Sequence, residues 1–89
     1  MRNVRRAEWH AHFDRLPQHI RALAEKSFTR FCNNAGHPSL RVRKMRSRHR
    51  GHECIEATIS MDYRAVAYID GSTYVWFWIG THNAFDSRF

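Results

Sequence analysis

His82 carries the side chain best suited to proton transfer, because an imidazole titrates near neutral pH. It follows Gly80 and Thr81 close to the end of the chain, and Asp86 lies four residues further on. If this tail is helical, the spacing brings the Asp86 carboxylate beside the imidazole, where it orients the ring. The alternative is an idle surface histidine, since the chain contains seven histidines.

A basic segment supplies the second set of candidate residues. Six of the ten residues in the segment 41–50 are cationic, and residues 26–52 carry eight cations and no acid. Thirteen of the fifteen cations in the chain are arginine, whose planar guanidinium binds phosphate through paired hydrogen bonds. The segment predicts a surface for nucleic-acid phosphates, although an acidic protein segment would fit it too. The residues assigned to this RNA-binding surface are Arg41, Arg43, Lys44, Arg46, Arg48, His49, Arg50 and His52.

The composition describes one small globular domain covering residues 1–89. Apolar residues make up 43% of the chain, twelve residues are aromatic, and the net charge is +7. No apolar run reaches the length of about 18–20 residues that spans a bilayer, and no apolar leader follows the first arginines. We therefore expect an unexported, cytoplasmic protein that contacts no membrane. Cys32 and Cys54 are predicted to be buried thiols.

No metal site or cofactor is predicted. The two histidines of His10-x-His12 would lie on different sides of a helix, and no cysteine pair or carboxylate–histidine cluster completes a set of ligands.

The first third of the chain predicts two helices. Trp9, Phe13 and Leu16 share one face of a short helix that Pro17 interrupts. Pro17 then suits the first turn of a second helix that ends near residues 33–36. The apolar face of this second helix is predicted to contain Ile20, Leu23, Ala24, Phe28, Phe31 and Cys32.

The remainder predicts strands over residues 40–45, 53–61, 63–69 and 73–79. Residues 46–51 are expected to form an exposed basic turn, and Asp70-Gly71 a tight hairpin turn. In the last strand, alternation places Tyr74, Trp76 and Trp78 on one face, where they either stack bases or pack against a helix. Helices followed by consecutive strands indicate an α+β fold with the helices on one sheet face.

Four strings, in this order and spacing, resemble the RelE/ParE superfamily of type II toxin–antitoxin toxins, and the resemblance covers about residues 9–86. They are Leu16-Pro17 with the helix to Phe31, His37-Pro38-Ser39-Leu40 before basic residues, Tyr63-Arg64-Ala65-Val66, and Trp78-Ile79-Gly80-Thr81-His82. The resemblance implies an N-terminal helical hairpin packed on a small, curved antiparallel sheet. The superfamily's usual first strand would fall in residues 1–5, a segment so short that we expect the strand to be vestigial or absent.

The RelE-like branch, which we favour, implies a metal-independent endoribonuclease that cleaves mRNA, usually on the ribosome, and is neutralised by an antitoxin in a hetero-oligomer. Such cleavage uses the 2′-hydroxyl of the RNA as nucleophile, so it needs a base, an acid and cations around the phosphorane. The resemblance assigns the scissile phosphate to Arg64 and proton transfer to His82. It places Phe85 where many relatives carry tyrosine, so Phe85 either stacks on a base or anchors the tail.

Two other functions stay open from the sequence. A ParE-like inhibitor of DNA gyrase needs no catalysis, and it is favoured by the absence of that tyrosine and by the strand before Tyr63-Arg64, which carries Glu53 and Glu56 but no cation. A catalytically inactive module that binds nucleic acid and antitoxin is the other. In either case Arg64 would be a strand arginine paired with Glu56 or Asp62.

Overall fold

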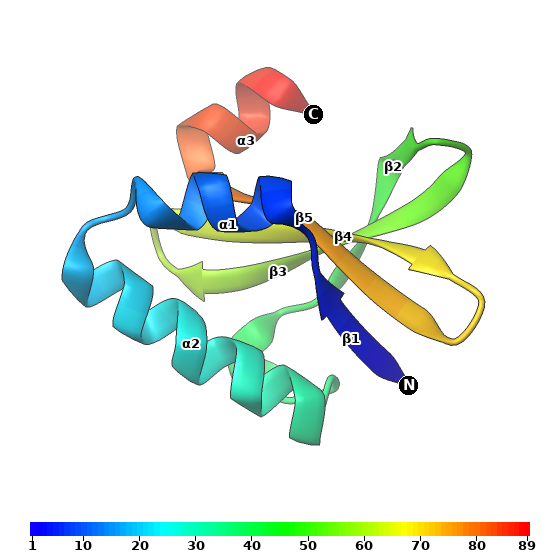
Figure 1. Cartoon of the computed structure of the whole chain (residues 1–89), viewed down its shortest axis with the longest axis horizontal. Coiled ribbons are helices and arrows are strands. Elements are labelled where there is room, and N and C mark those ends of the chain that lie inside the picture. Colours follow the sequence, from blue (N-terminus) through cyan, green and yellow to red (C-terminus); the bar gives the residue numbers. More distant parts are fainter.

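The computed structural model describes residues 1–89 and consists of a five-stranded sheet with helices on both faces (Figure 1). Its elements, in chain order, are β1 (Arg2–Arg5), α1 (Ala7–Asp14), α2 (Gln18–Asn33), the 3-10 turn η1 (Pro38–Leu40), β2 (Arg43–His49), β3 (His52–Ser60), β4 (Tyr63–Asp70), β5 (Thr73–Thr81) and α3 (His82–Arg88). No helix is both long enough and apolar enough to cross a membrane. The α+β class predicted from the sequence is confirmed.

The strand order is β1-β5-β4-β3-β2, so β4 lies at the centre of the sheet. Strands β2 to β5 are antiparallel, whereas β1 runs parallel to β5. The sheet is therefore mixed, and the expectation of an all-antiparallel sheet was wrong. Residues 1–5 do contain a strand. This strand is short, but its side chains contact the rest of the fold. The Nε1–H of Trp76 in β5 donates a 3.1 Å hydrogen bond to Asn3, and the Arg5 guanidinium lies over the Phe28 ring.

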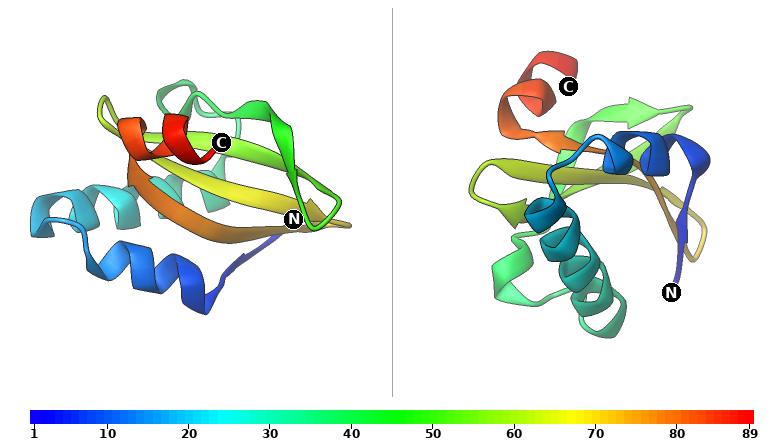
Figure 2. Two further views of the ribbon diagram at one scale, coloured as in Figure 1. Left: turned by 90° about the horizontal axis from the view of Figure 1, so that it is seen from above. Right: turned by 60° about the vertical axis from the view of Figure 1, so that its left-hand side comes forward.

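Helices α1 and α2 cover one face of the sheet, as Figure 2 shows. Trp9 and Phe13 stack at 4.9 Å in α1, and the predicted break at Pro17 separates the two helices. The buried residues of this layer are Trp9, Leu16, Ile20, Ala24, Phe31, Leu40, Ile55, Ala57, Ala65, Ala67, Trp76 and Ile79. Two predicted members of the α2 face lie outside the core, because Leu23 and Cys32 are exposed, so the prediction of a buried Cys32 thiol was wrong. Cys54 is buried, as expected.

A third helix, α3, covers the opposite face of the sheet, which we call the α3 face (Figure 2). The buried residues of this face are Cys54, Val66, Tyr68, Val75, Phe77 and Trp78. Phe85 and Phe89 of the helix pack against them, with the Phe89 ring 5.5 Å from Trp78 and 6.2 Å from Phe77. The polar tail is thus helical and docks through its two phenylalanines.

Two predictions about the strands were wrong. The first concerns residues 46–51, because β2 begins at Arg43 and continues to His49, so most of the expected basic turn is strand. The second concerns Trp78, which lies on the α3 face while Trp76 lies beneath α1 and α2. The cause is a bulge: Val66 pairs with Trp78 and the next residue, Ala67, pairs with Trp76. Phe77 is therefore an additional residue that reverses the alternation.

Candidate functional site

Arg64 lies on the central strand β4 and points to the α3 face, because it alternates with Val66 and Tyr68. Its register partner on β5 is Gly80. A Cβ atom at Gly80 would lie 2.7 Å from the Trp78 ring, so only glycine lets this indole lie across the strand beside Arg64. The side chain of Arg64 is 13% exposed, which leaves the guanidinium partly open to solvent.

The turn between β3 and β4 fixes the Arg64 guanidinium. Its Nη1 donates to the carbonyl oxygens of Ser60, Met61 and Tyr63 at 2.7, 3.1 and 2.9 Å. No hydrogen bond within the protein uses Nη2, and the buried Nε lacks a hydrogen-bond partner. The arginine is therefore held by one nitrogen while a second nitrogen stays available to an anion.

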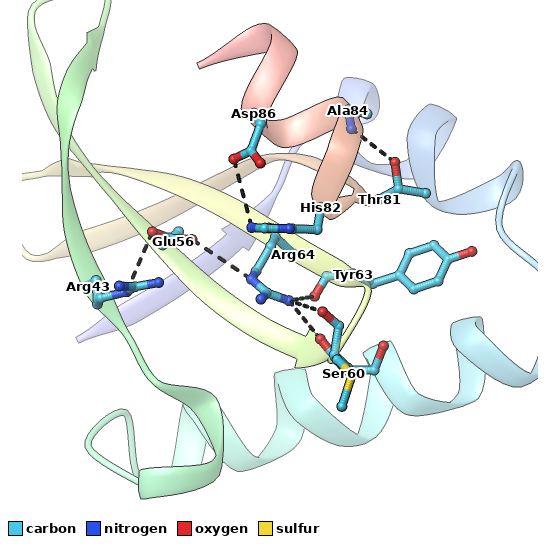
Figure 3. Close-up of polar contacts among 10 residues, drawn as sticks. Arg43, Glu56, Ser60, Tyr63, Arg64, Thr81, His82, Ala84 and Asp86 are labelled. Atoms are coloured by element: carbon cyan, nitrogen blue, oxygen red, sulfur yellow. Dashed lines mark hydrogen bonds and ion pairs between the residues drawn. The ribbon is translucent and has the colours of Figure 1, made fainter.

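Glu56 belongs to the candidate site, although the sequence did not single it out as a functional residue. It comes from β3, and Figure 3 shows it between the side chains of Arg43 and Arg64. Its Oε1 lies 3.7 Å from Arg43 Nε and its Oε2 lies 4.0 Å from Arg64 Nε. The pairing of Arg64 with Glu56 anticipated from the sequence is present. The alternation of Cys54, Glu56 and Thr58 was the available signal, since it places the carboxylate on the face that Arg64 occupies.

His82 is the first residue of α3, and Thr81 caps the helix by accepting a 3.0 Å hydrogen bond from Ala84 N. The imidazole Nε2 lies 3.8 Å from Asp86 Oδ1, the i,i+4 contact predicted for a helical tail (Figure 3). The His82 side chain is 45% exposed, so substrate and solvent can reach it. Its backbone N–H donates a 2.7 Å hydrogen bond to the carbonyl of Asp62, in the same turn that holds Arg64.

Phe85 packs on Trp78 with a centroid distance of 6.1 Å and lies parallel to the His82 ring at 6.4 Å. Together with Phe89 it forms one wall of a hollow of about 210 Å³ between α3 and β2. The opposite wall includes Glu56, Met45 and the backbone of β2. The hollow thus brings a carboxylate, an aromatic ring and the basic strand together on the α3 face.

The predicted RNA-binding residues divide into two groups. The six cations Arg41, Arg43, Lys44, Arg46, Arg48 and Arg50 are all exposed along the β2 edge of the sheet. Three are paired, Arg43 with Glu56 and both Lys44 and Arg48 with Glu53. The other three, Arg41, Arg46 and Arg50, have no ion pair.

His49 and His52 form the second group. Unlike the exposed cations, their rings stack against Tyr68, at 5.3 and 5.0 Å. His49 also stacks on Phe77 at 4.0 Å, and its Nε2 is buried without a partner. Burial, followed by the charge of Arg50, lowers the pKa of His49. Both rings are therefore built into the α3 face of the sheet.

No group of three or more His, Cys, Asp or Glu side chains gathers in an arrangement that would hold a metal ion. Comparison with known proteins gives no matching family model and no matching curated sequence. Solved structures do match. A chain of the RelB–RelE antitoxin–toxin complex from Methanococcus jannaschii superimposes with a TM-score of 0.74 at 14% identity, covering 97% of this chain and 98% of that one.

YafQ from Escherichia coli matches with a TM-score of 0.72 at 12% identity, covering 96% of this chain and 98% of YafQ. A copper-bound mutant toxin from Helicobacter pylori matches with a TM-score of 0.64 at 13% identity, covering 94% and 97%. The chain has the RelE-like toxin fold. In this RelE-like fold, the site formed by Arg64, Glu56 and His82 lies on the face of the sheet that α3 covers.

Proposed function

We propose that this chain is the toxin of a toxin–antitoxin system and that it cleaves mRNA as a metal-independent endoribonuclease. The observation that carries the proposal is that the β3–β4 turn binds both Arg64 and His82. Carbonyls of Ser60, Met61 and Tyr63 hold the guanidinium, and that of Asp62 accepts the His82 backbone N–H. A cation and a proton-transfer group are thereby positioned on one open surface.

The proposed reaction is an internal transfer of the phosphodiester. The 2′-oxygen forms a bond to phosphorus, the bond from phosphorus to the 5′-oxygen breaks, and the products carry a 2′,3′-cyclic phosphate and a 5′-hydroxyl. Arg64 Nη2 stabilises the charge that develops on the phosphorane oxygens, because a fixed donor needs no reorganisation during the reaction. Restricting Arg64 through Nη1 favours this role, since a positioned group acts more effectively than a mobile one.

Glu56 and His82 are the groups proposed to move protons. Glu56 accepts the proton of the 2′-hydroxyl as the base, and protonated His82 donates a proton to the departing 5′-oxygen as the acid. The contact with Asp86 supports this role because a carboxylate beside an imidazole fixes the orientation of the ring. Phe85 orients the imidazole through the parallel packing of the two rings.

The exposed cations of β2 are proposed to bind RNA phosphates on either side of the cleaved nucleotide, in mRNA held by the ribosome. His49 of β2 and His52 of β3 contribute by packing these two strands against Tyr68 of β4. An antitoxin is the proposed protein partner in a hetero-oligomer, as supported by the RelB–RelE complex and the E. coli DinJ–YafQ complex among the structural neighbours. Because its substrate is translated mRNA, the protein is proposed to act in the cytoplasm.

Induced expression in a bacterial host tests the proposal, with transcript ends mapped and with protein and DNA synthesis followed by pulse labelling. New 5′-hydroxyl ends and a rapid fall in translation are expected for the native chain. His82→Ala and Arg64→Lys should lose both effects, whereas His19→Ala and Arg2→Lys, at exposed positions away from the site, should keep them. Loss of DNA synthesis with intact transcripts would instead indicate a gyrase inhibitor, and absence of arrest a non-catalytic binding module.

A further inference from the structure

A second hollow lies on the other side of α3 from Arg64 and His82, between the C-terminal part of α1, the end of β5 and α3. We call it the α1–α3 groove. Its floor contains Leu16 and Trp78, and its rim contains His12, Arg15 and Arg88. In Figure 1, α3 begins above the last turn of α1 and runs back in the opposite direction. Neither the catalytic proposal nor the basic strand β2 uses these residues.

The rim of the α1–α3 groove is cationic and contains no acid. No ion pair or side-chain hydrogen bond occupies the guanidinium of Arg15 or that of Arg88. The Arg88 guanidinium lies over the neighbouring Phe89 ring, 5.8 Å from its centroid. Burial, then the charges of Arg88 and Arg15, lower the pKa of His12, and the charge of Glu8 opposes them. Two unpaired guanidinium groups and an imidazole thus lie close enough to interact.

The groove is continuous with the candidate site across the first turn of α3. Thr81 lines the groove, and the next residue, His82, faces the opposite side of the helix. On α3 itself, Ala84, Ser87 and Arg88 face the groove, whereas Phe85 packs against the sheet. A polymer bound at the site therefore reaches the groove by passing over the start of the helix.

We propose that the α1–α3 groove binds the phosphate backbone of the single-stranded RNA that flanks the nucleotide bound at Arg64 and His82. This inference rests on the proposed function. An arginine guanidinium that has no carboxylate partner can donate paired hydrogen bonds to the oxygens of a phosphodiester. We favour RNA over an acidic amphipathic helix of a protein partner, because such a helix would need exposed apolar surface in the groove against which to bury its own apolar face. Leu16, Trp78 and Ile79 in the floor are only 8%, 3% and 1% exposed, so the core has already buried them.

The test measures binding of fluorescein-labelled 2′-O-methyl oligouridylates, which lack the nucleophilic hydroxyl and are not cleaved. The variant Arg15→Gln/Arg88→Gln should bind a 12-mer several-fold more weakly than the native chain, and the slope of log affinity against log salt should decrease by about 0.7 for each phosphate that the variant no longer binds. A 4-mer confined to the site should be bound equally by both proteins. The control, Arg2→Gln/Lys26→Gln, removes two exposed charges elsewhere and should bind both oligonucleotides normally.

The outcomes separate the two proposals. If the 12-mer binds the native chain and the groove variant equally, the groove inference is overturned while the proposed function stands. If the native chain binds neither oligonucleotide, the groove inference is overturned, and mapping of transcript ends in the induced host decides the proposed function separately. If the groove variant loses binding only to an acidic amphipathic helical peptide, with Leu at i, i+3, i+4 and i+7 and Glu on its other face, the groove would be assigned to a protein partner instead. In NMR titrations, the 12-mer should also raise the pKa of His12, because phosphate charge favours the imidazolium.

Discussion

The backbone N–H of His82 donates a 2.7 Å hydrogen bond to the carbonyl of Asp62, which lies in the turn between β3 and β4. Three other carbonyls of the segment 60–63 bind the Arg64 guanidinium. One two-residue turn therefore sets the position of both the cation and the proposed acid. The turn holds His82 through its backbone N–H and Arg64 through its guanidinium. The geometry of the turn therefore determines how the two residues of the candidate site lie relative to each other.

Inserting one glycine between Met61 and Asp62 should therefore reduce RNA cleavage at least tenfold while both functional side chains remain, because displacements of about 1 Å can cost about 10²-fold. The matched control inserts one glycine between Gly71 and Ser72, in the hairpin turn at the other end of β4. Cleavage rates and circular dichroism of the two purified insertion variants give the comparison. Equal activity in the two would show that the turn does not position the site.

Glu56→Gln should reduce the rate of cleavage by roughly 10²–10⁴-fold, the usual contribution of a general base, and leave the protein folded. Glutamine retains the shape of the side chain between Arg43 and Arg64 but cannot accept the proton of the 2′-hydroxyl. Glu53→Gln is the control, since Glu53 is a more exposed glutamate of the same strand that pairs with Lys44 and Arg48. An unchanged rate in Glu56→Gln would remove Glu56 from the reaction.

Sequence patterns predicted the elements more reliably than the site. Alternating apolar residues identified β3, β4 and β5, and the i,i+4 spacing of His82 and Asp86 predicted a contact that the structure contains. The extent of β2 was missed because an edge strand buries little surface, so its arginines and serine have the composition of a solvated loop. Trp78 was assigned to the wrong face because alternation cannot reveal a bulge at Phe77.

The role of Glu56 was missed for a different reason. In sequence, an acid on the strand before Arg64 counts against a phosphate site, since it adds negative charge and no cation. In the sheet, Arg43 on one side and Arg64 on the other flank this carboxylate. The alternation of Cys54, Glu56 and Thr58 indicates the face that Glu56 occupies, but its position between the two arginines depends on the register of three strands. The resemblance that assigned Arg64 and His82 depended on short strings and gave no information about the partners of either residue.

Gly80→Ala should destabilise the protein by about 1–3 kcal/mol, the usual cost of overpacking. The added methyl group would lie 2.7 Å from the Trp78 ring, and the indole is packed against Phe85 and Phe89. Gly36→Ala is the control, because its nearest neighbour would be 3.5 Å away at the Asn34 side chain, an ordinary contact. Urea denaturation measures both. Similar midpoints for the two variants would contradict the predicted clash.

Phe85→Ala should destabilise the fold by about 1–2 kcal/mol and reduce cleavage, because it removes the half-buried ring that docks α3 and orients His82. Phe85→Leu separates docking from base stacking, since leucine preserves apolar contact with Trp78 but offers no ring. If Phe85 acts as an anchor, the leucine variant keeps most of the stability and activity. A stable but inactive leucine variant would show that the ring itself is required, either to orient His82 or to stack on the RNA.

Acidification should weaken the fold through His49. Its ring stacks on both Phe77 and Tyr68, and burial followed by the Arg50 charge lowers its pKa below the ordinary value of about 6.5. The unfolded chain then binds the proton more readily, so the free energy of unfolding falls as the pH decreases through 6.5 and is highest above it. Arg6 and Arg88 also oppose the charged ring, whereas Glu8 favours it.

Urea midpoints at pH 7.5 and pH 5 measure the effect. The difference between the two midpoints should shrink in His49→Phe, which keeps the aromatic stack and cannot be protonated. It should shrink in His12→Gln as well, because burial and then Arg88 and Arg15 lower the pKa of His12 in the same direction. His19→Gln, at an exposed position on α2, should leave the difference unchanged. A full pH dependence in His49→Phe would show that the stacked histidine does not control acid stability.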